Sequence, residues 1–489
     1  SSDTSIIGLT PNFDPEFPTA PKLTSGHQRA NPEVTNKGSV PYRHDGPGRA
    51  SFAIALLLAG LALHFFRLAQ PAAIVFDEVH FGGFANAYCC TGEYIFDVHP
   101  PHGKLLAALG MKLGGYDGGQ SFASIGTPLT NLQPWLLRLV PALTGSLVPV
   151  LVFIILLQLG ASRWAAFLGG WAVLFDNALL LQTRVLALDG TLILSMLVAI
   201  SLALLAISQR GGPRQSLICL GAGLCVGMAV GTKLTGLTSA LLVAVIFLAP
   251  LQRDSNWVDT ARMGGVAALG ALAVYLGGWA LHFLLLDQPG PGDIWGAPSG
   301  NLVHDIIDIH RSMFQANYGL AATHPNGSAW WGWPWMWRPL YYYAGPNFAL
   351  YFVGNPVVWW GSSIGLLWLV WGTVRRLLSK ASTVDTSAGQ QVARLLPLLG
   401  FLVSFLPFIV IPRVMFLYHY LPSLVFAVCT VALWLDRHGW TQEGSFAEQS
   451  RAARWLLIAI PVGFLVISPI TYGFVLPADI LSALVKLVH

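Results

Sequence analysis

Two adjacent carboxylates, Asp77 and Glu78, follow directly on the first apolar stretch, in the segment AIVFDEVHFGGF. A carboxylate beside a bound hydroxyl can accept its proton, which is what the base of an inverting glycosyl transfer must do. Consecutive side chains on a helix diverge by about 100°, so both cannot face one site. We therefore expect one of the two to act on substrate and the other to pair with a cation. A solvated pair in a loop is the alternative interpretation.

Basic residues form a second set of candidates, because they lie near the ends of apolar stretches or in the long segments between them. A cation at membrane depth is unfavourable unless it has a partner or a ligand. Several cations that converge on one face would suit an anionic headgroup such as a phosphate or a diphosphate. Pairing with Asp176, with Asp189 or with backbone carbonyls is the alternative. The residues concerned are Lys104, Arg138, Arg184, Lys233, Arg311, Arg338 and Arg413.

Histidines recur in the same segments, but their spacing does not predict a metal site. His99 and His102 flank Pro100–Pro101 and so do not share one helix face, and HxxEH-type zinc spacing is absent. We expect the histidines to hydrogen-bond sugar or phosphate, with metal ligation as the less favoured alternative, and we expect no cofactor. The sequence contains no P-loop, dinucleotide fingerprint or Ser-His-Asp order. The histidines are His80, His99, His102, His304, His310, His324 and His419.

The elements that must position these residues are membrane helices. Hydrophobic residues make up 54% of the 489 residues and charged residues only 10%, and the mean hydropathy is +0.60. A soluble domain carries about a quarter charged residues. The net charge of +4, without Lys/Arg runs among aromatics, does not support nucleic-acid binding.

All five cysteines are expected to be structural, and adjacent Cys89 and Cys90 are not expected to pair, because disulfide geometry is demanding.

The apolar stretches predict an all-α polytopic membrane protein with about eleven transmembrane helices. Residues 1–49 are polar and rich in Pro, Asn, Ser and Thr, which predicts a disordered cytoplasmic tail before a catalytic membrane domain over 50–489. Lys and Arg are concentrated in the turns after even-numbered spans, so the positive-inside rule places the amino terminus in the cytoplasm. The expected spans are about 51–70, 134–158, 162–180, 190–207, 216–232, 235–250, 264–286, 350–373, 395–411, 415–435 and 455–475.

Two long segments between spans, about 71–133 and 287–349, are expected on the outer face, where function concentrates. Residues 300–317 predict an amphipathic helix that lies flat at the interface, with His304, Asp308 and Arg311 turned to the catalytic face. The aromatic tract 330–343 predicts either a lipid anchor or one wall of an acceptor groove. The groove residues would be His324, Trp333, Trp335, Arg338 and Tyr342.

Eight segments, taken together, resemble the protein O-mannosyltransferase family. They follow the family's order and extend from residue 71 to about 435, and their joint occurrence is much more specific than any one of them. This chain departs from the family's HPPLGK pattern at His102, and the Cys89–Cys90 pair is also outside the pattern. The segments are FDEVHFGGF (76–84), DVHPPHGKLL (97–106), RLVPALTGS (138–146), FDNALLLQTRVLALDG (175–190), GTKLTG (231–236), HPNGSAWWGWPWMWRPLYYY (324–343), GNPVVWW (354–360) and RVMFLYHYLP (413–422).

The resemblance implies a GT-C glycosyltransferase fold, a polyprenyl-phosphate mannose donor, and Ser or Thr hydroxyls of exported polypeptides as acceptors. It also implies that Asp77 is the catalytic carboxylate with Glu78 beside it, and that Arg138 is the family's arginine of the second span. The second long loop, at about 60 residues, is too short for the β-trefoil domain of eukaryotic members. The chain therefore resembles the bacterial branch, which implies a plasma-membrane enzyme with its site on the outer face.

From placement and resemblance together we assign the binding of the donor phosphate and sugar to a set of charged and polar residues. The expected partners are the polyprenyl-phosphate mannose donor, membrane lipids and secreted Ser/Thr-containing polypeptides, for which the translocon is one source; nucleic acid is not expected. The donor set is Arg138, Lys233, Arg413, His99, Lys104, Asp189 and Arg184.

Two other functions stay open at this point. A related GT-C enzyme with a lipid or glycan acceptor, similar to an aminoarabinose transferase, would share the type of donor and differ in the acceptor groove. A transporter or flippase would show inverted repeats and broken helices near the middle of the bilayer. The polar residues of this sequence gather instead at one predicted face.

Overall fold

The computed structural model describes residues 47–209, 211–250, 256–290, 298–319, 323–378 and 388–488, which all belong to one compact unit, 42–489. The predicted tail over 1–49 lies outside the described residues as far as residue 46. Its last three residues already belong to the first helix, α1 (Pro47–Phe65), so the helical domain begins earlier than expected.

Membrane-length helices make up most of the described chain, which confirms the predicted fold class. Eight helices among the described residues are long and apolar enough to cross a membrane, and two shorter apolar helical segments, Leu234–Leu248 and Leu395–Val410, lie where spans six and nine were expected. The eight are α1, α5 (Leu139–Gln158), α8 (Asp189–Ile207), α9 (Gly212–Thr232), α11 (Trp257–Leu285), α13 (Pro356–Leu378), α15 (Leu421–Arg437) with the turn η6 (Leu417–Tyr420) before it, and α16 (Arg451–Tyr472).

The third expected span, 162–180, is not one helix. It is divided into α6 (Arg163–Leu174) and α7 (Asn177–Gln182) at Asp176. The Asp176 carboxylate accepts hydrogen bonds from the backbone N–H of Leu179 at 2.8 Å, from that of Asn355 at 3.0 Å and from the indole of Trp359 at 2.8 Å. Such a cap starts a new helix, because the side chain satisfies N–H groups that a continuous helix would pair internally. Asp176 therefore caps α7 and also binds two N–H groups at the beginning of α13.

The two shorter apolar segments are each built from two elements. The first combines η2 (Leu234–Gly236) with α10 (Leu237–Leu248), and the second combines the end of α14 (Ala388–Phe405) with η5 (Leu406–Val410). α15 and α8 are the most enclosed spans, whereas α1, α11 and α13 expose most of their apolar side chains. In a membrane protein such exposed leucines and tryptophans face lipid.

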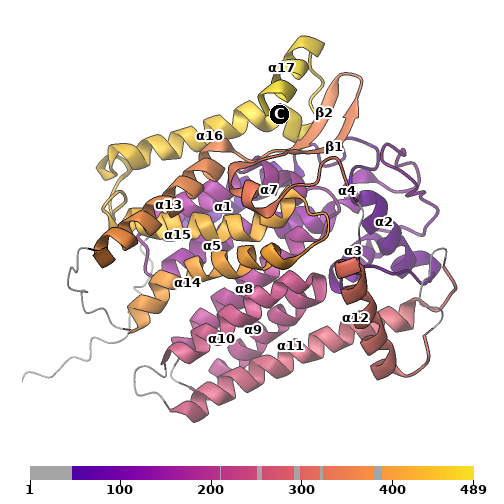
Figure 1. Ribbon diagram of the computed structural model, residues 1–489, viewed down its shortest axis with the longest axis horizontal. Helices are drawn as coiled ribbons and strands as arrows, with labels where there is room; N and C mark the ends of the chain where they lie inside the picture. The colour runs from indigo at the N-terminus through magenta and orange to yellow at the C-terminus, as the bar shows by residue number, and fades with distance from the viewer. Residues whose placement is uncertain are drawn as a thin grey trace, which may run out of the picture. The chain divides into compact units, whose positions relative to one another are not determined.

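The long loops are folded, and their elements gather at one end of the helix bundle (Figure 1). The first loop holds α2 (Glu78–Asn86), η1 (Ala87–Thr91), α3 (His102–Leu113) and α4 (Pro134–Leu137). The second holds α12 (Leu302–Gly319), η4 (Trp330–Trp335) and the strands β1 (Leu340–Gly345) and β2 (Phe348–Phe352). The last elements are η7 (Phe446–Glu448) and α17 (Ala478–Val488).

The β1–β2 hairpin is an exception to the all-α prediction, and it occupies the expected beginning of the eighth span. The strands are antiparallel, with Leu340 opposite Phe352 and Gly345 opposite Phe348, and a register shift between Tyr341 and Tyr343. Aromatic residues favour strands, and the Pro-Asn pair between the strands favours a turn. The hydropathy pattern alone does not distinguish such a strand from the first turn of a span.

Cys89 and Cys90 form a disulfide, contrary to the expectation that adjacent cysteines stay unpaired. Both belong to the π-helical turn η1, and this local conformation, which residue spacing does not reveal, brings the two sulfur atoms together. The other three cysteines, Cys219, Cys225 and Cys429, are free and lie in helices.

Candidate active site

Asp77 stands at the beginning of α2 with its carboxylate unpaired. The side chain is only partly accessible, yet it accepts no hydrogen bond and forms no ion pair with any residue in the described ranges. Burial raises the pKa of Asp77 to about 7; nearby Lys233 opposes this rise, and the carboxylates of Asp189 and Asp97 add to it. A carboxylate that changes protonation near neutral pH is suited to take up a proton from a substrate.

Glu78 has the opposite environment, because it forms a bidentate ion pair with Arg138. The guanidinium donates from Nε to Oε1 at 2.8 Å and from Nη2 to Oε2 at 3.0 Å, and the two side chains are 0% and 2% exposed. Glu78 also accepts the backbone N–H groups of Val75 at 3.0 Å and of Leu186 at 3.1 Å. One of the two carboxylates is thus paired with a cation, as expected: Glu78 is the paired residue, and Asp77 is the free one.

The geometry does not leave Arg138 free to bind a donor phosphate. Its remaining N–H groups donate to the carbonyls of Leu68, Pro71 and Ala73 at 2.9–3.2 Å, so all five guanidinium donors have protein partners. Arg138 instead fixes the backbone between α1 and Asp77. The sequence placed a cation near the end of a helix correctly, but it did not reveal the acid partner in a separate loop.

Arg184 likewise turns away from Asp77. Its Nε donates to the carbonyl of His64 at 3.0 Å, its Nη2 donates to the carbonyl of Phe66, and its guanidinium carbon lies 4.4 Å from the centroid of the Tyr472 ring. These contacts hold the end of α1 against α16. The expected role of Arg184 in donor binding therefore does not fit its position.

Lys233 and Asp189 form a buried ion pair close to Asp77. Lys233 follows α9 and donates to Asp189 Oδ1 at 2.8 Å, while its ammonium lies 5.3 Å from the centroid of the Tyr418 ring. Asp189 begins α8 and accepts a second hydrogen bond, at 2.7 Å, from the amide of Gln182 at the end of α7. The ammonium has three donors and uses one of them here, so it can still donate to a phosphate oxygen.

Lys104 is paired with Asp97, a residue that the sequence did not single out. The ammonium donates to Asp97 Oδ2 at 2.6 Å and to the carbonyl of His99 at 2.8 Å. Burial alone would raise the pKa of Asp97, but Lys104 and His99 outweigh it and hold that pKa below its usual value. Burial lowers the pKa of His99 to about 3, with Asp97 opposing and the cations Lys233, Lys104 and Arg413 adding to the effect. His99 is therefore neutral at physiological pH.

Arg413 is the cation that remains free near this cluster. It precedes η6, is half-buried, and makes no hydrogen bond or ion pair with any residue in the part of the chain that the structure describes. The positive charge of Arg413 interacts electrostatically with the imidazoles of His99 and His419. Tyr418 and Gln182, like Asp97, were outside the expected site, whereas His419 was one of the histidines expected to hydrogen-bond sugar or phosphate. They lie inside segments that carry the family resemblance, which is the signal that could have found them.

An open groove of about 550 Å³ adjoins Arg413. One wall is the segment from Thr323 to Trp330, and the other is the segment from Phe408 to Met415. His324, which was expected to line the acceptor groove, is part of this wall. The groove thus has a cation, a polar side and an apolar side.

The other four expected acceptor residues do not line this groove. Trp333 is fully buried, with its indole N–H donating to Ser328 Oγ at 2.9 Å, and Tyr342 is fully buried against the ring of Phe76. Trp335 is 47% exposed, and Arg338 is exposed with one N–H bound to the carbonyl of Gly327. The aromatic tract is therefore mainly a packing element, although Trp330, its first residue, lines the groove.

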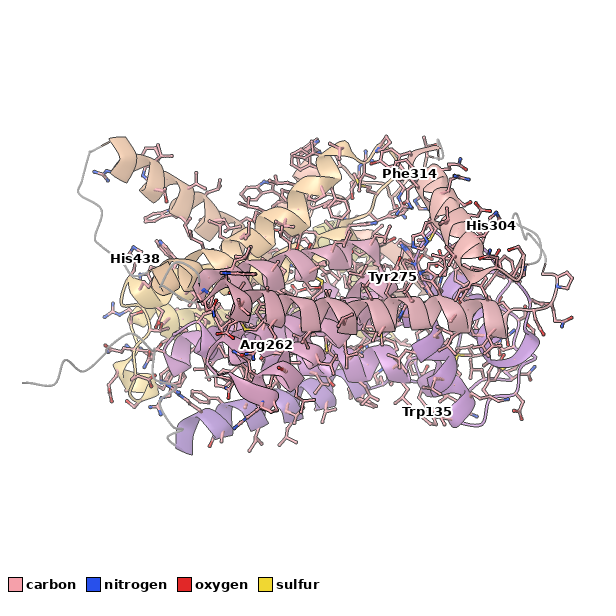
Figure 2. All side chains as sticks on the ribbon, turned by 90° about the horizontal axis from the view of Figure 1, so that it is seen from below. Trp135, Arg262, Tyr275, His304, Phe314 and His438 are labelled. Atoms are coloured by element: carbon pink, nitrogen blue, oxygen red, sulfur yellow. A yellow bond between two sulfur atoms is a disulfide. The ribbon has the colours of Figure 1, made fainter. Side chains whose placement is uncertain are left out.

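The amphipathic helix forms, as α12, but its polar stripe faces outward. His304, Asp308 and Arg311 are exposed and pair with one another, whereas Ile309 and Met313 pack against α11. Figure 1 shows α12 crossing α11, and Figure 2 shows its residues His304 and Phe314 on one side of α11, where Tyr275 of α11 contacts His310 of α12. The spacing predicted the stack of three polar side chains, but these side chains do not turn towards Asp77, because the apolar stripe takes the inner side.

His102, the departure from the family pattern, joins three helices. It begins α3, and its two ring nitrogens lie 2.9 Å from the carbonyl of Gly231 on α9 and 2.8 Å from that of Val274 on α11. Gly231 and Gly278 make room for the ring, since a Cβ on either would come within about 2.2 Å of it.

Among the described residues, no three His, Cys, Asp or Glu side chains come together as a candidate metal site.

Two family models match the chain. The model described as "Dolichyl-phosphate-mannose-protein mannosyltransferase" matches residues 54–285, and the one described as "C-terminal four TMM region of protein-O-mannosyltransferase" matches residues 302–487. Protein O-mannosyltransferase 1 of Drosophila melanogaster is 35% identical over 255 residues, which are 50% of this chain and 28% of the relative. Dolichyl-phosphate-mannose–protein mannosyltransferase 4 of Schizosaccharomyces pombe is 41% identical over 159 residues, 31% of this chain and 20% of the relative.

Solved structures share the fold. The S. cerevisiae protein O-mannosyltransferase Pmt1–Pmt2 complex bound to the sugar donor superposes with a TM-score of 0.80 at 19% identity, over 90% of this chain and 92% of that one. ArnT from Cupriavidus metallidurans bound to undecaprenyl phosphate gives 0.51 at 13% identity, over 90% and 76%. The matched regions span between 20% and 34% of the length of these curated relatives. With both halves matched by its models, the chain belongs to the protein O-mannosyltransferase family and has the GT-C fold.

Proposed function

We propose that this protein transfers mannose from a polyprenyl-phosphate carrier to Ser or Thr hydroxyls of exported polypeptides, with inversion at the sugar. The observation that carries the proposal is the unpaired Asp77 carboxylate, with a pKa of about 7, near Lys233, which can still take a ligand. Arg413, which is also free to take a ligand, acts together with Lys233 on the imidazoles of His99 and His419. A base and an anion-binding pair at one place are the two requirements of a displacement at an activated sugar.

In the proposed reaction Asp77 accepts the proton of the acceptor hydroxyl. The hydroxyl oxygen forms a bond to the anomeric carbon as the bond from that carbon to the phosphate oxygen breaks. The electron pair of the broken bond stays on the phosphate, which leaves as polyprenyl phosphate. Lys233 and Arg413 stabilise the charge that develops on it, because fixed cations in a site of low dielectric need no reorganisation during the reaction. Family membership supports this assignment of donor and acceptor.

The groove beside Arg413 suits both substrates. Phe408, Ile409 and Ile411 form an apolar wall, and exposed apolar side chains continue along η5, where a hydrocarbon carrier would lie with its phosphate at Arg413. The opposite wall, with His324 and Ser328, offers hydrogen-bonding groups to an extended polypeptide. The carrier and the acceptor would then approach Asp77 from two sides of one opening.

We further propose a multi-pass protein of a bacterial plasma membrane, with the amino terminus in the cytoplasm and Asp77 near the outer face. The distribution of cations supports this orientation. Arg163, Arg262, Arg451 and Arg454 lie at the ends of helices whose opposite ends approach the folded loops. Exported polypeptides, including those leaving the translocon, would reach the site from outside.

The test is a transfer assay with purified protein, polyprenyl-phosphate mannose labelled in the sugar, and a Ser/Thr-rich peptide. We expect label in the peptide, and none when every Ser and Thr of the peptide is replaced by Ala. The same assay with a lipid or a glycan acceptor tests the aminoarabinose-transferase-like alternative. Transfer to that acceptor and not to the peptide would contradict the proposal.

A further inference from the structure

The residue before the proposed base has an unusual backbone conformation. Phe76 has a φ of +44°, which places a bulky residue in the left-handed region. Such a conformation is unfavourable for a residue with a branched or large side chain and persists only where the surroundings impose it. Because Phe76 directly precedes Asp77, whatever imposes this conformation also sets the direction of the Asp77 carboxylate.

Aromatic rings on two sides impose it. The ring of Tyr342, from β1, is stacked on the Phe76 ring with centroids 4.1 Å apart and an interplanar angle of 9°. The ring of Tyr418, from η6, meets Phe76 edge-on at 6.1 Å. Tyr342 is itself fully buried and packs on Phe352 of the neighbouring strand. The hairpin thus serves as a rigid support for the segment that carries Asp77.

A hydrogen-bonded path leads from this support to the cation Lys233. The Tyr342 hydroxyl donates to Oε1 of Gln182, the Gln182 amide donates to Asp189 Oδ2 at 2.7 Å, and Asp189 Oδ1 accepts from Lys233 at 2.8 Å. The four residues come from β1, α7, α8 and the end of α9. All four are buried, so each link is protected from exchange with water.

Glutamine is the side chain that this path requires at position 182. One end of it must accept from a hydroxyl, and the other must donate to a carboxylate, which an amide does and a carboxylate or an apolar side chain does not. A glutamate there would place a second negative charge against Asp189. A leucine would leave the buried Tyr342 hydroxyl and one Asp189 oxygen without their partners, which is unfavourable in a buried site.

We propose that Gln182 is a positioning residue that couples the Asp77 segment to Lys233, so that the base and the cation for the leaving phosphate are held in one fixed arrangement. The inference rests on the proposed function for its catalytic meaning, and its structural part stands on the contacts alone. Loss of the link is expected to reduce kcat more than it raises KM, because both partners remain present and only their relative placement changes. A small misplacement of reacting groups can lower a rate by roughly 10²-fold.

The test is a double-mutant cycle with Gln182→Leu and Tyr342→Phe, measured as kcat and KM for mannose transfer to the peptide. We expect each single variant to lower kcat by roughly 10-fold or more and the double variant to be no worse than the poorer single one, since both break the same path. Effects that multiply, or no effect on kcat, would overturn the coupling. Tyr342→Phe removes one oxygen and keeps the stacked ring, so it tests the path even if Gln182→Leu reduces the yield of folded protein.

A second readout does not depend on catalysis. Asp77 is acted on by Lys233, Asp189 and Asp97, so its titration reports the placement of Lys233. The difference in Tm between a protein and the same protein carrying Asp77→Asn grows as pH rises above the unfolded-state pKa, and the midpoint of the folded-state titration is the pH at which this difference stops growing. In the Gln182→Leu and Tyr342→Phe backgrounds we expect the midpoint to move to higher pH, because Lys233 stabilises the ionised form less well.

Matched controls remove similar groups elsewhere. Gln215→Leu takes away a buried amide that bonds Arg262 and the carbonyl of Ala206, and Tyr88→Phe takes away a buried hydroxyl that bonds His282. Neither is expected to move the Asp77 midpoint. An unchanged midpoint in the Gln182→Leu protein, or an equal shift in the controls, would overturn the proposal. A wild-type protein that transfers no mannose would contradict the proposed function, while the midpoint would still decide the coupling.

Discussion

The two ends of the helix bundle use charged residues in different ways. At the end that carries the folded loops, Glu78 and Arg138 are almost fully buried, and Lys233 pairs with Asp189 inside the protein. At the other end Arg163 pairs with Glu443 at 3.2 Å, and these side chains are 28% and 56% exposed. Water screens the second pair and not the first. The loop end therefore keeps its charges in a coupled, low-dielectric arrangement, and Asp77 is unpaired within it.

The change that should separate the two ends most strongly is Asp77→Asn. An amide cannot accept the proton of the acceptor hydroxyl, so kcat is expected to fall by roughly 10²–10⁴-fold. Donor affinity should change little, because Asp77 does not bind the phosphate in the proposed reaction. Steady-state transfer kinetics and a direct donor titration measure the two quantities. Near-normal turnover of the Asn variant would remove Asp77 from the role of base.

Arg138→Ala should mainly unfold the loop end. The substitution leaves Glu78 as an unpaired buried carboxylate and frees three backbone carbonyls, and breaking a buried ion pair from one side costs about 3–5 kcal/mol. We expect a large fall in Tm and in the yield of folded protein, measured by size-exclusion chromatography and a thermal melt in detergent. A stable variant whose only defect is weaker donor binding would restore Arg138 to the phosphate site.

Arg413→Ala should show the reverse pattern. Arg413 has no protein partner among the described residues, so its loss should leave Tm nearly unchanged. A charge-assisted hydrogen bond to phosphate contributes roughly 1.5–3 kcal/mol, so the apparent Kd of the donor should rise by about tenfold or more. The measurement is a titration with polyprenyl-phosphate mannose, with Arg311→Ala on the exposed side of α12 as the matched control. Equal donor affinity in both variants would move the phosphate elsewhere.

The stability of the protein should also record the unusual state of Asp77. Its folded-state pKa is about 7, above the ordinary value of 3.8 that holds in the unfolded chain. The folded protein therefore binds the proton more tightly, and the contribution of Asp77 to stability is lost as pH rises from about 4 to about 7. Asp77→Asn should match the parent in Tm at pH 4 and exceed it at pH 8. An equal Tm at both pH values would contradict the raised pKa.

Glu443→Gln should have the smallest effect. Exposed ion pairs contribute about 0–1 kcal/mol, so we expect a change in Tm near the error of a melt and no change in kcat. The same exchange at Glu78, Glu78→Gln, tests the comparison directly, because it removes the same charge from a buried pair. If Glu443→Gln lowered the Tm as much as Glu78→Gln, the ion pairs at the two ends would contribute equally to stability, contrary to what their different exposure predicts.

Composition and periodicity predicted most of the helices because a membrane span is a local property of about 20 residues. They failed where a distant residue decides the local structure. Asp176 interrupts a span because Asn355 and Trp359 supply its partners, and nothing in the span itself indicates this. The β1–β2 hairpin is apolar enough to read as the beginning of a span, although its aromatic strands pack against the base segment.

The site was predictable in kind and less so in detail. The adjacency of Asp77 and Glu78 implied one free and one paired carboxylate, and the structure has that arrangement. The sequence did not show which cation would form the ion pair with Glu78. Arg138 lies 60 residues away, and the loop between the two residues must fold before they can meet. Gln182 was overlooked because a glutamine in an apolar helix carries no signal of its own, and its meaning comes from two partners on other elements.

The ring of His102 has a consequence for how this protein can vary. Three positions in separate parts of the chain, 102, 231 and 278, share one volume: a flat ring at the first excludes a Cβ at the other two. An aliphatic side chain at 102, as in the usual family pattern, would reach neither carbonyl and would fill the slot differently. A substitution at any one of the three positions is therefore expected to destabilise the protein, whereas a simultaneous substitution at all three can be tolerated. We therefore expect the residues at positions 102, 231 and 278 to change together rather than one at a time.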